Sequence, residues 1–266
     1  MGTLGRVRIL LSNDDGIFAP GLAALHAALG GLGERTVVAP ASGRSAVGHG
    51  ITLHKPLIVQ HVPSSGPEEF TGISVDGNPA DCVKLAIRRL LARPPELVCT
   101  GINAGANVGI NVFYSGTVAA AAEAAMLGVP AVAFSADTSG GEVDYARVGR
   151  LCRGVLDRLL AAGLDGGTLV NVNVPALGPT EPAIRVAPQS GVEIEDVYHR
   201  VTDEAGREGY HLGAEYAFDD HAEHTDVALL AAGCITVTPL QVDMTDHARL
   251  EQLRTAEAGV EGAAGP

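Results

Sequence analysis

Two adjacent carboxylates stand where the first apolar run of the chain stops. The run Ile9-Leu10-Leu11 is followed closely by Asn13, Asp14, Asp15 and Gly16, a pattern that predicts a buried strand ending in a turn. Two neighbouring carboxylates repel each other, and this repulsion is costly unless a cation lies between them. A simple helix-capping turn is the alternative. We favour a divalent metal site because both acids follow the same strand.

Two further loops place polar residues after predicted strands. They are the loop 41–50, with Arg44, Ser45, Gly48 and His49, and the loop 102–116, with Asn103 and Asn107, which leads into Ser115, Gly116 and Thr117 at a helix start. In a parallel sheet such loops gather at one edge. Their carboxylate, hydroxyl and amide oxygens suit Mg²⁺, Mn²⁺ or Ca²⁺ better than zinc. Hydroxyls and backbone N–H groups at a helix N-terminus suit a phosphate, so the combination predicts phosphoryl chemistry.

The elements that must position these loops alternate between strands and helices. Strands are predicted at 9–12, 35–40, 51–60, 70–75, 97–101, 130–135, 168–174 and 234–238. Helices are predicted at 22–32, 78–93, 117–127, 143–162, 226–232 and 246–253. This alternation indicates a mostly parallel sheet with right-handed crossovers. We therefore expect a Rossmann-like, three-layer α/β fold, with the strand 51–60 pairing with 70–75.

The 266 residues divide by composition. We expect an α/β catalytic core over residues 1–188, a C-terminal arm with a returning strand and helix over 189–254, and a disordered Ala/Gly/Glu tail over 255–266. Residues 191–226 carry eleven acidic residues against two arginines, and thus nine of the thirteen net negative charges. This segment lacks helical periodicity, which predicts hairpins or long excursions. It also has few large apolar residues, so it needs another surface to order against.

Several classes of protein lack support in the sequence. No basic stripe is present, which argues against nucleic-acid binding by phosphate neutralisation. No uncharged apolar stretch reaches the ~18 residues of a membrane span. The four cysteines stand singly in apolar surroundings, as in a cytoplasmic protein with reduced thiols. Phosphate-binding P-loops, dinucleotide fingerprints and esterase elbows do not follow any predicted strand.

Five motifs, in this order, resemble the survival protein SurE family and its 5′-nucleotidases. They are Asn13–Ile17, Arg44-Ser45 with Gly48-His49, Gly77–Cys82, Thr100–Asn107 and Tyr114–Thr117, and the stretch from Thr225 to Leu240 is similar to the C-terminal part of the family. The likeness covers nearly the whole chain except the tail. One departure is Ala41, which stands where the family usually has an acid and removes a charge near Ser45.

The resemblance implies a set of site residues and an activity. The implied metal ligands are Asp14, Asp15, Ser45 and Asn103, holding one divalent cation per subunit, Mg²⁺ or Mn²⁺. The implied phosphate-binding residues are Asn107, Ser115, Gly116 and Thr117. The implied reaction is hydrolysis of nucleoside 5′-monophosphates, often also of 3′-monophosphates. The implied assembly is a homodimer or homotetramer that exchanges C-terminal elements between subunits.

Proton transfer has three candidates. Asp14 or Asp15 could combine metal binding with proton abstraction from water. His49, the histidine nearest the predicted site, could protonate the leaving oxygen or hold the phosphate, or it could simply bond to the backbone of its loop.

Three other functions remain open at the level of sequence. One is a nucleotide-binding or assembly protein of the same fold without turnover, and another is a phosphatase for a different small phosphomonoester. The third is an enzyme with an aspartyl-phosphate intermediate. That enzyme would need two acids one residue apart and a downstream lysine, whereas Asp14 and Asp15 are adjacent and Lys55 and Lys84 fit no such motif.

Overall fold

The centre of the fold is a nine-stranded sheet, seen in a computed structural model that describes residues 7–63, 70–191, 197–213 and 222–263. Its strand order is β3-β4-β2-β1-β5-β6-β7-β11-β8. The bounds are β1 Val7–Ser12, β2 Gly33–Pro40, β3 Val59–Pro63, β4 Thr71–Val75, β5 Leu97–Ala104, β6 Ala131–Ala136, β7 Leu169–Val174, β8 Ile184–Val186 and β11 Ile235–Leu240. Within this sheet β3, β8 and β11 run opposite to the other strands. The predicted mostly parallel sheet is confirmed.

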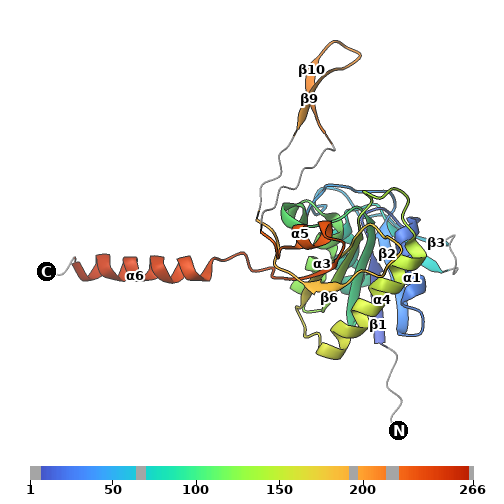
Figure 1. Cartoon of the computed structure of the whole chain (residues 1–266), viewed down its shortest axis with the longest axis horizontal. Coiled ribbons are helices and arrows are strands. Elements are labelled where there is room, and N and C mark those ends of the chain that lie inside the picture. Colours follow the sequence, from blue (N-terminus) through green and yellow to red (C-terminus); the bar gives the residue numbers. More distant parts are fainter. Residues whose placement is uncertain (1–6, 64–69, 192–196, 214–221, 264–266) are drawn as a thin grey trace, which may run out of the picture.

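Helices cover both faces of the sheet and complete three layers (Figure 1). The helices are α1 Pro20–Ala28, α2 Pro79–Leu85, α3 Gly116–Met126, α4 Tyr145–Ala162, α5 Asp226–Ala231 and α6 His247–Ala263, with a π-helical turn at Ala86–Leu90 and a 3₁₀ turn at Gly109–Phe113. The pair α1 and α4 packs on one face, and the pair α2 and α3 packs on the other. Across the described part of the chain, none of the helices has the length and apolarity to span a bilayer.

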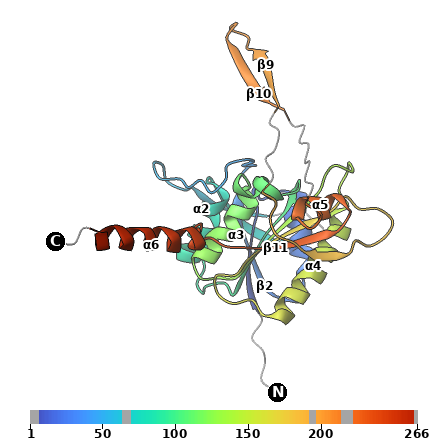
Figure 2. The ribbon, with the colours of Figure 1, turned by 60° about the vertical axis from the view of Figure 1, so that its left-hand side comes forward.

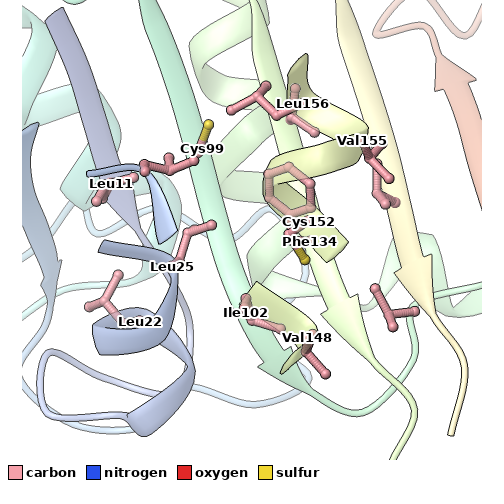
Figure 3. Close-up of a cluster of buried hydrophobic side chains, with 14 of the residues drawn as sticks. Leu11, Leu22, Leu25, Cys99, Ile102, Phe134, Val148, Cys152, Val155 and Leu156 are labelled. Carbon is pink, nitrogen blue, oxygen red and sulfur yellow. The ribbon is translucent and has the colours of Figure 1, made fainter. Parts of the chain in front are cut away.

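The core is two apolar clusters, one on each face of the sheet. The cluster under α1 and α4 joins side chains of both helices to the strands (Figure 3), among them Leu22, Leu25, Cys99, Phe134, Cys152 and Leu156. The cluster under α2 and α3 is built largely from small residues, with Ala120, Ala121 and Ala124 of α3 against the sheet. Small side chains let α3 lie close to the strands, and this brings its N-terminus to the sheet edge where the acids lie.

Two predicted elements have different bounds in the structure, and one strand was not predicted. The first helix ends at Ala28 rather than near residue 32, because the chain turns through Gly31, whose φ is 78°. The strand predicted at 51–60 is β3, which begins only at Val59; Pro56 lacks the N–H that a sheet ladder needs. Strand β8 was not predicted, because three residues are too few for a periodic pattern.

The C-terminal part contains the predicted hairpin. Strands β9, Tyr198–Thr202, and β10, Glu208–Leu212, pair with each other in a separate antiparallel sheet, which stands away from the main sheet in both views (Figures 1 and 2). The rest of the acidic segment includes residues 192–196 and 214–221, which lie outside the described residues. Helix α6 runs to Ala263, so a helix replaces the predicted disordered tail over residues 255–263; alanine and glutamate there are strong helix formers.

Candidate functional site

Three loops meet at the carboxyl ends of β2, β1 and β5, which are neighbours in the sheet. Together with the residues before α3 they enclose a cavity of about 260 Å³. Its lining is Asp14, Asp15, Ser45, Ala46, Asn103, Ala104, Gly105, Ala106, Asn107, Asn111, Tyr114 and Ser115. We call this cavity the acid pocket. All four predicted metal ligands and two of the four predicted phosphate-binding residues line it.

The first two loops are fastened to each other by their backbones. The side-chain amide of Asn13 donates to the carbonyl of Gly16 at 2.9 Å and closes the turn after β1. Gly16 has a φ of 102°, and a Cβ there would lie 3.2 Å from the backbone of Ser42, so glycine permits the close approach. The N–H of Arg44 donates to the carbonyl of Asp14 at 2.7 Å. This bond fixes the position of the loop that carries Ser45 relative to the two aspartates.

Arg44 also forms an ion pair outside its own loop. Its guanidinium lies 3.0 Å from one carboxylate oxygen of Asp76, and the other oxygen of Asp76 lies 3.0 Å from Lys55. These two cations lower the pKa of Asp76, with Lys55 the larger influence. The ion pair connects the loop that carries Ser45 to the residue that follows β4.

The two aspartates lie in an environment that disfavours two negative charges. Asp14 is 5% exposed, and burial raises its pKa; the neighbouring charge of Asp15 raises it further, while a hydrogen bond from Thr117 lowers it in part. Burial also raises the pKa of Asp15, against a partial lowering by the N–H of Ala104, which donates to its carboxylate at 3.1 Å. A cation between the carboxylates would stabilise both ionised forms.

Helix α3 contacts the acids through its first turn. The hydroxyl of Ser115 caps the helix by accepting from the N–H of Val118 at 3.1 Å. The hydroxyl of Thr117 donates to Asp14 at 2.5 Å and is fully buried. In this structure the Thr117 hydroxyl thus orients a carboxylate, and its contact with phosphate stays a prediction. Gly116 packs against Asp14, since a Cβ there would lie 2.7 Å from the Asp14 Cβ.

A buried polar network holds the asparagine loop. The side chain of Asn103 donates to the carbonyl of Gly105 at 2.7 Å, which leaves its amide oxygen as the group able to bind a cation. The Asn107 side chain donates to the Ser135 hydroxyl at 2.8 Å. The predicted contact between this side chain and phosphate would therefore use the second N–H of its amide group. The backbone of Asn107 is clamped by Asn171 and Asn173 of β7, at 2.7 Å to its carbonyl and 2.7 Å to its N–H.

Sequence reasoning missed the residues that support the pocket. Asn171 and Asn173 stand at alternate positions of an otherwise apolar strand, and both are fully buried. Buried amides require hydrogen-bond partners, so this pattern was a usable signal. Ser135 and Asn111 carried no comparable signal, because a serine in a strand and an asparagine in a loop are common in purely structural roles.

His49 lies apart from the acids. It lines a different, more apolar cavity beside α3, and its Nε2 is 2.9 Å from Glu123, which also binds Lys84 at 2.9 Å. The hydrogen bond to His49 is the main influence that lowers the pKa of Glu123, and Lys84 adds to it. The structure thus does not bring His49 together with the predicted catalytic aspartates. It gives His49 the role of tying its loop to α3.

The pocket fits a hard divalent cation. Among the described residues no group of three His, Cys, Asp or Glu side chains could hold a metal ion, so binding here requires Ser45 and Asn103 in addition to the two aspartates. Such an all-oxygen set is the kind that Mg²⁺, Mn²⁺ and Ca²⁺ prefer. The buried Oδ1 of Asn13, next to the aspartates in the chain, makes no hydrogen bond within the described structure. The arrangement can bind a cation next to a helix N-terminus.

Comparisons with known proteins give one consistent family. The family model described as "Survival protein SurE" matches residues 9–196. The 5′-nucleotidase SurE of Heliobacterium modesticaldum is 42% identical over 249 residues, which are 93% of this chain and 90% of that protein. The 5′-nucleotidase SurE 1 of Thermus thermophilus is 44% identical over 254 residues, 96% and 99% of the two chains. The crystal structure of the SurE protein from Aquifex aeolicus superimposes with a TM-score of 0.79 at 35% identity, covering 94% of this chain and 99% of that one. The family model spans the three pocket loops, and the two relatives are aligned over more than nine-tenths of this chain.

Replacing Gly116 with alanine tests the packing of α3 on the acids. The added Cβ would meet Asp14, and displacement of the carboxylate should weaken Mn²⁺ binding by roughly 10- to 100-fold, the range for residues that orient metal ligands. Isothermal titration calorimetry measures this affinity. Gly154→Ala is the control, because its Cβ would meet no atom within 4 Å. Equal Mn²⁺ affinity in both variants would show that the approach of α3 does not matter.

The pH dependence of stability tests the Glu123 cluster. Because the pKa of Glu123 is lowered in the fold, its ionised form stabilises the protein above the ordinary carboxyl pKa of about 4.3. That contribution disappears as the pH falls through the lowered pKa. Glu123→Gln should therefore reduce the free energy of unfolding at pH 7, and the deficit should shrink toward pH 3.5 in urea denaturation. A deficit that is constant with pH would contradict the linkage.

Proposed function

The chain belongs to the survival protein SurE family, and we propose that it is a 5′-nucleotidase that depends on a divalent cation. The observation that carries the proposal is the acid pocket, where the buried carboxylate of Asp14, the half-buried carboxylate of Asp15, a serine and an asparagine lie beside the N-terminus of α3. Relatives covering almost the whole chain are named 5′-nucleotidase SurE. The proposed substrates are nucleoside 5′-monophosphates, with 3′-monophosphates as a second class.

The roles of the residues follow from their places in the pocket. Asp14, Asp15, Ser45 and Asn103 would hold one Mg²⁺ or Mn²⁺. When bound, the cation would polarise the phosphoryl group and make a nucleophilic water available at neutral pH. Ser115 and the N-terminus of α3 would bind the phosphate oxygens. Asp15, which is less buried than Asp14, is the better placed of the two to accept a proton from water.

A metal-by-substrate activity series tests the proposal. EDTA should abolish hydrolysis of a nucleoside 5′-monophosphate, and Mg²⁺ or Mn²⁺ should restore it. Asp15→Asn should reduce kcat by roughly a hundredfold or more, because a metal ion contributes several kcal/mol of transition-state stabilisation. The control is Asp137→Asn, whose carboxylate binds Ser139 and lines another cavity. Full activity of Asp15→Asn, or full activity in EDTA, would refute the cation-dependent mechanism.

The same series separates the alternatives. A nucleotide-binding protein without turnover would bind the nucleoside monophosphate and release no phosphate under any metal. A phosphatase for another small phosphomonoester would hydrolyse a generic aryl phosphate with Mn²⁺ but leave nucleotides intact. The adjacent pair of carboxylates in the pocket favours turnover, because a binding site for an anion has no use for two acids.

We also propose that the chain forms a homodimer or homotetramer through its C-terminal elements. An isolated two-stranded hairpin is marginally stable in water, yet Tyr198, Tyr210 and Leu212 of the β9–β10 hairpin are all exposed. Helix α6 likewise extends away from the main sheet (Figure 2). A second copy could cover these surfaces by exchanging identical elements.

The four free cysteines, three of them buried, support a reducing location such as the cytoplasm.

Light scattering tests the assembly. The full-length protein at micromolar concentration should have at least the mass of a dimer, because the exposed aromatic residues of the hairpin require a partner surface. Deletion of residues 192–220 should give a folded species of lower mass. A full-length monomer would refute the exchange of C-terminal elements and would leave the proposal for the acid pocket untouched.

A further inference from the structure

Among the described residues, three buried carboxylates lie outside the acid pocket and take no part in the proposed reaction: Asp81, Glu123 and Asp226. Asp226, at the start of α5, is 0% exposed. One of its oxygens accepts from the N–H groups of Ser190, at 2.8 Å, and of Val227, at 2.9 Å. The other accepts from the N–H of Gly109 at 3.0 Å. A buried carboxylate is costly unless several donors satisfy it, and here three backbone donors from three parts of the chain do so.

One of these bonds, together with a bond of the Asp226 backbone, closes the neck of the acidic segment. We use "neck" for residues 188–190 and 225–227, which lead into and out of that segment. The Asp226 side chain binds Ser190, and the Asp226 N–H donates to the carbonyl of Pro188 at 3.0 Å. The two ends of a 36-residue excursion are thus held together. The segment that carries the β9–β10 hairpin therefore begins and ends at one fixed position on the α/β core.

The third bond joins the neck to the wall of the acid pocket. Gly109 lies between Asn107 and Asn111, both of which line the pocket. Its carbonyl accepts from the Gln189 side chain at 2.8 Å, so the neck holds both polar groups of this residue. Its φ is 55°, a conformation that glycine adopts without strain.

An apolar contact seats the same loop on α5. Val108 packs with Val227 and Leu230, and all three are at most 7% exposed. On its other side the loop is clamped at Asn107 by β7. The spacing between Asn107 and Asn111 is therefore set by β7 at one end and by the neck in the middle.

We propose that Asp226 and Gln189 are positioning residues for the acid pocket, which fasten the loop 104–113 to the neck of the arm and thereby fix its asparagines for the substrate phosphate. The inference rests on the proposed function. Of the four proposed cation ligands, the two aspartates belong to the loop after β1, Ser45 to the loop after β2 and Asn103 to strand β5, so the neck acts on the substrate side and leaves the cation side unchanged. The buried Asp226 carboxylate thus contacts both the neck, at Ser190, and the loop that lines the acid pocket, at Gly109.

Two variants remove the link at different atoms. Asp226→Asn keeps the shape but turns an N–H₂ group toward a donor, either at Gly109 or at Ser190. Gln189→Leu removes the bond to the Gly109 carbonyl and leaves Asp226 in place, so it decides the question if Asp226→Asn does not fold. Thr225→Ala is the matched control: its hydroxyl caps α5 by accepting from Ala228, so its loss destabilises the same helix without removing a bond to Gly109.

Three readouts on the full-length protein separate positioning from folding. Both variants should raise the inhibition constant of inorganic phosphate and the KM of the nucleotide by roughly tenfold, the size expected for one lost hydrogen bond of this kind. Mn²⁺ affinity should stay unchanged. Amide hydrogen exchange over residues 104–113 should become faster. Thr225→Ala should lower the Tm without changing the phosphate inhibition constant.

The outcomes are distinguishable from failure of the proposed function. An unchanged phosphate inhibition constant in both variants would overturn the inference, as would an equal rise in Thr225→Ala. If the wild-type protein neither hydrolyses nucleotides nor responds to phosphate, the proposed function fails. In that case hydrogen exchange alone decides: faster exchange of the loop in Asp226→Asn or Gln189→Leu supports the fastening, and unchanged exchange overturns it.

Discussion

The pocket depends on keeping two neighbouring carboxylates in a space that disfavours both charges. Burial raises the pKa of Asp14 and of Asp15, and each is held by a donor, Thr117 for the first and the Ala104 N–H for the second. Gly116 lets the N-terminus of α3 reach the same place. A divalent cation would supply the counter-charge for this pair, as proposed, and the helix N-terminus beside it suits a phosphate. Cation and anion would thus be bound next to each other.

The loop that carries Asn103 and Asn107 is held in place by polar side chains that are buried in the sheet. Asn171, Asn173 and Ser135 sit on β7 and β6 and bind the loop that carries Asn103 and Asn107. Buried amides are stabilising only when they are paired, so the loop and the strands hold each other in one arrangement. A loop fixed in this way loses little conformational entropy when substrate binds.

The sequence predicted the sheet, its main helices and the meeting of three loops, because apolar runs bounded by turn residues are local signals. It placed Asp14, Asp15, Ser45 and Asn103 in one cavity, as observed. It could not reveal that the Thr117 hydroxyl faces Asp14 or that His49 binds Glu123, because the direction of a side chain is settled by tertiary packing. Likewise, the link from Asp226 to Gly109 spans 117 residues and has no local signature. For the acidic segment the sequence predicted hairpins or long excursions without strand bounds, since the exposed strands of the observed hairpin lack the alternation of a half-buried sheet.

Anomalous diffraction from crystals grown with Mn²⁺ tests the central claim most directly. The account predicts one strong anomalous peak in the acid pocket, within about 2.0–2.6 Å of carboxylate oxygens from both Asp14 and Asp15, as expected for a hard divalent cation. Oxygens of Ser45 and Asn103 should complete the protein ligands. A pocket without a peak at saturating Mn²⁺, or a peak held by neither aspartate, would contradict the account.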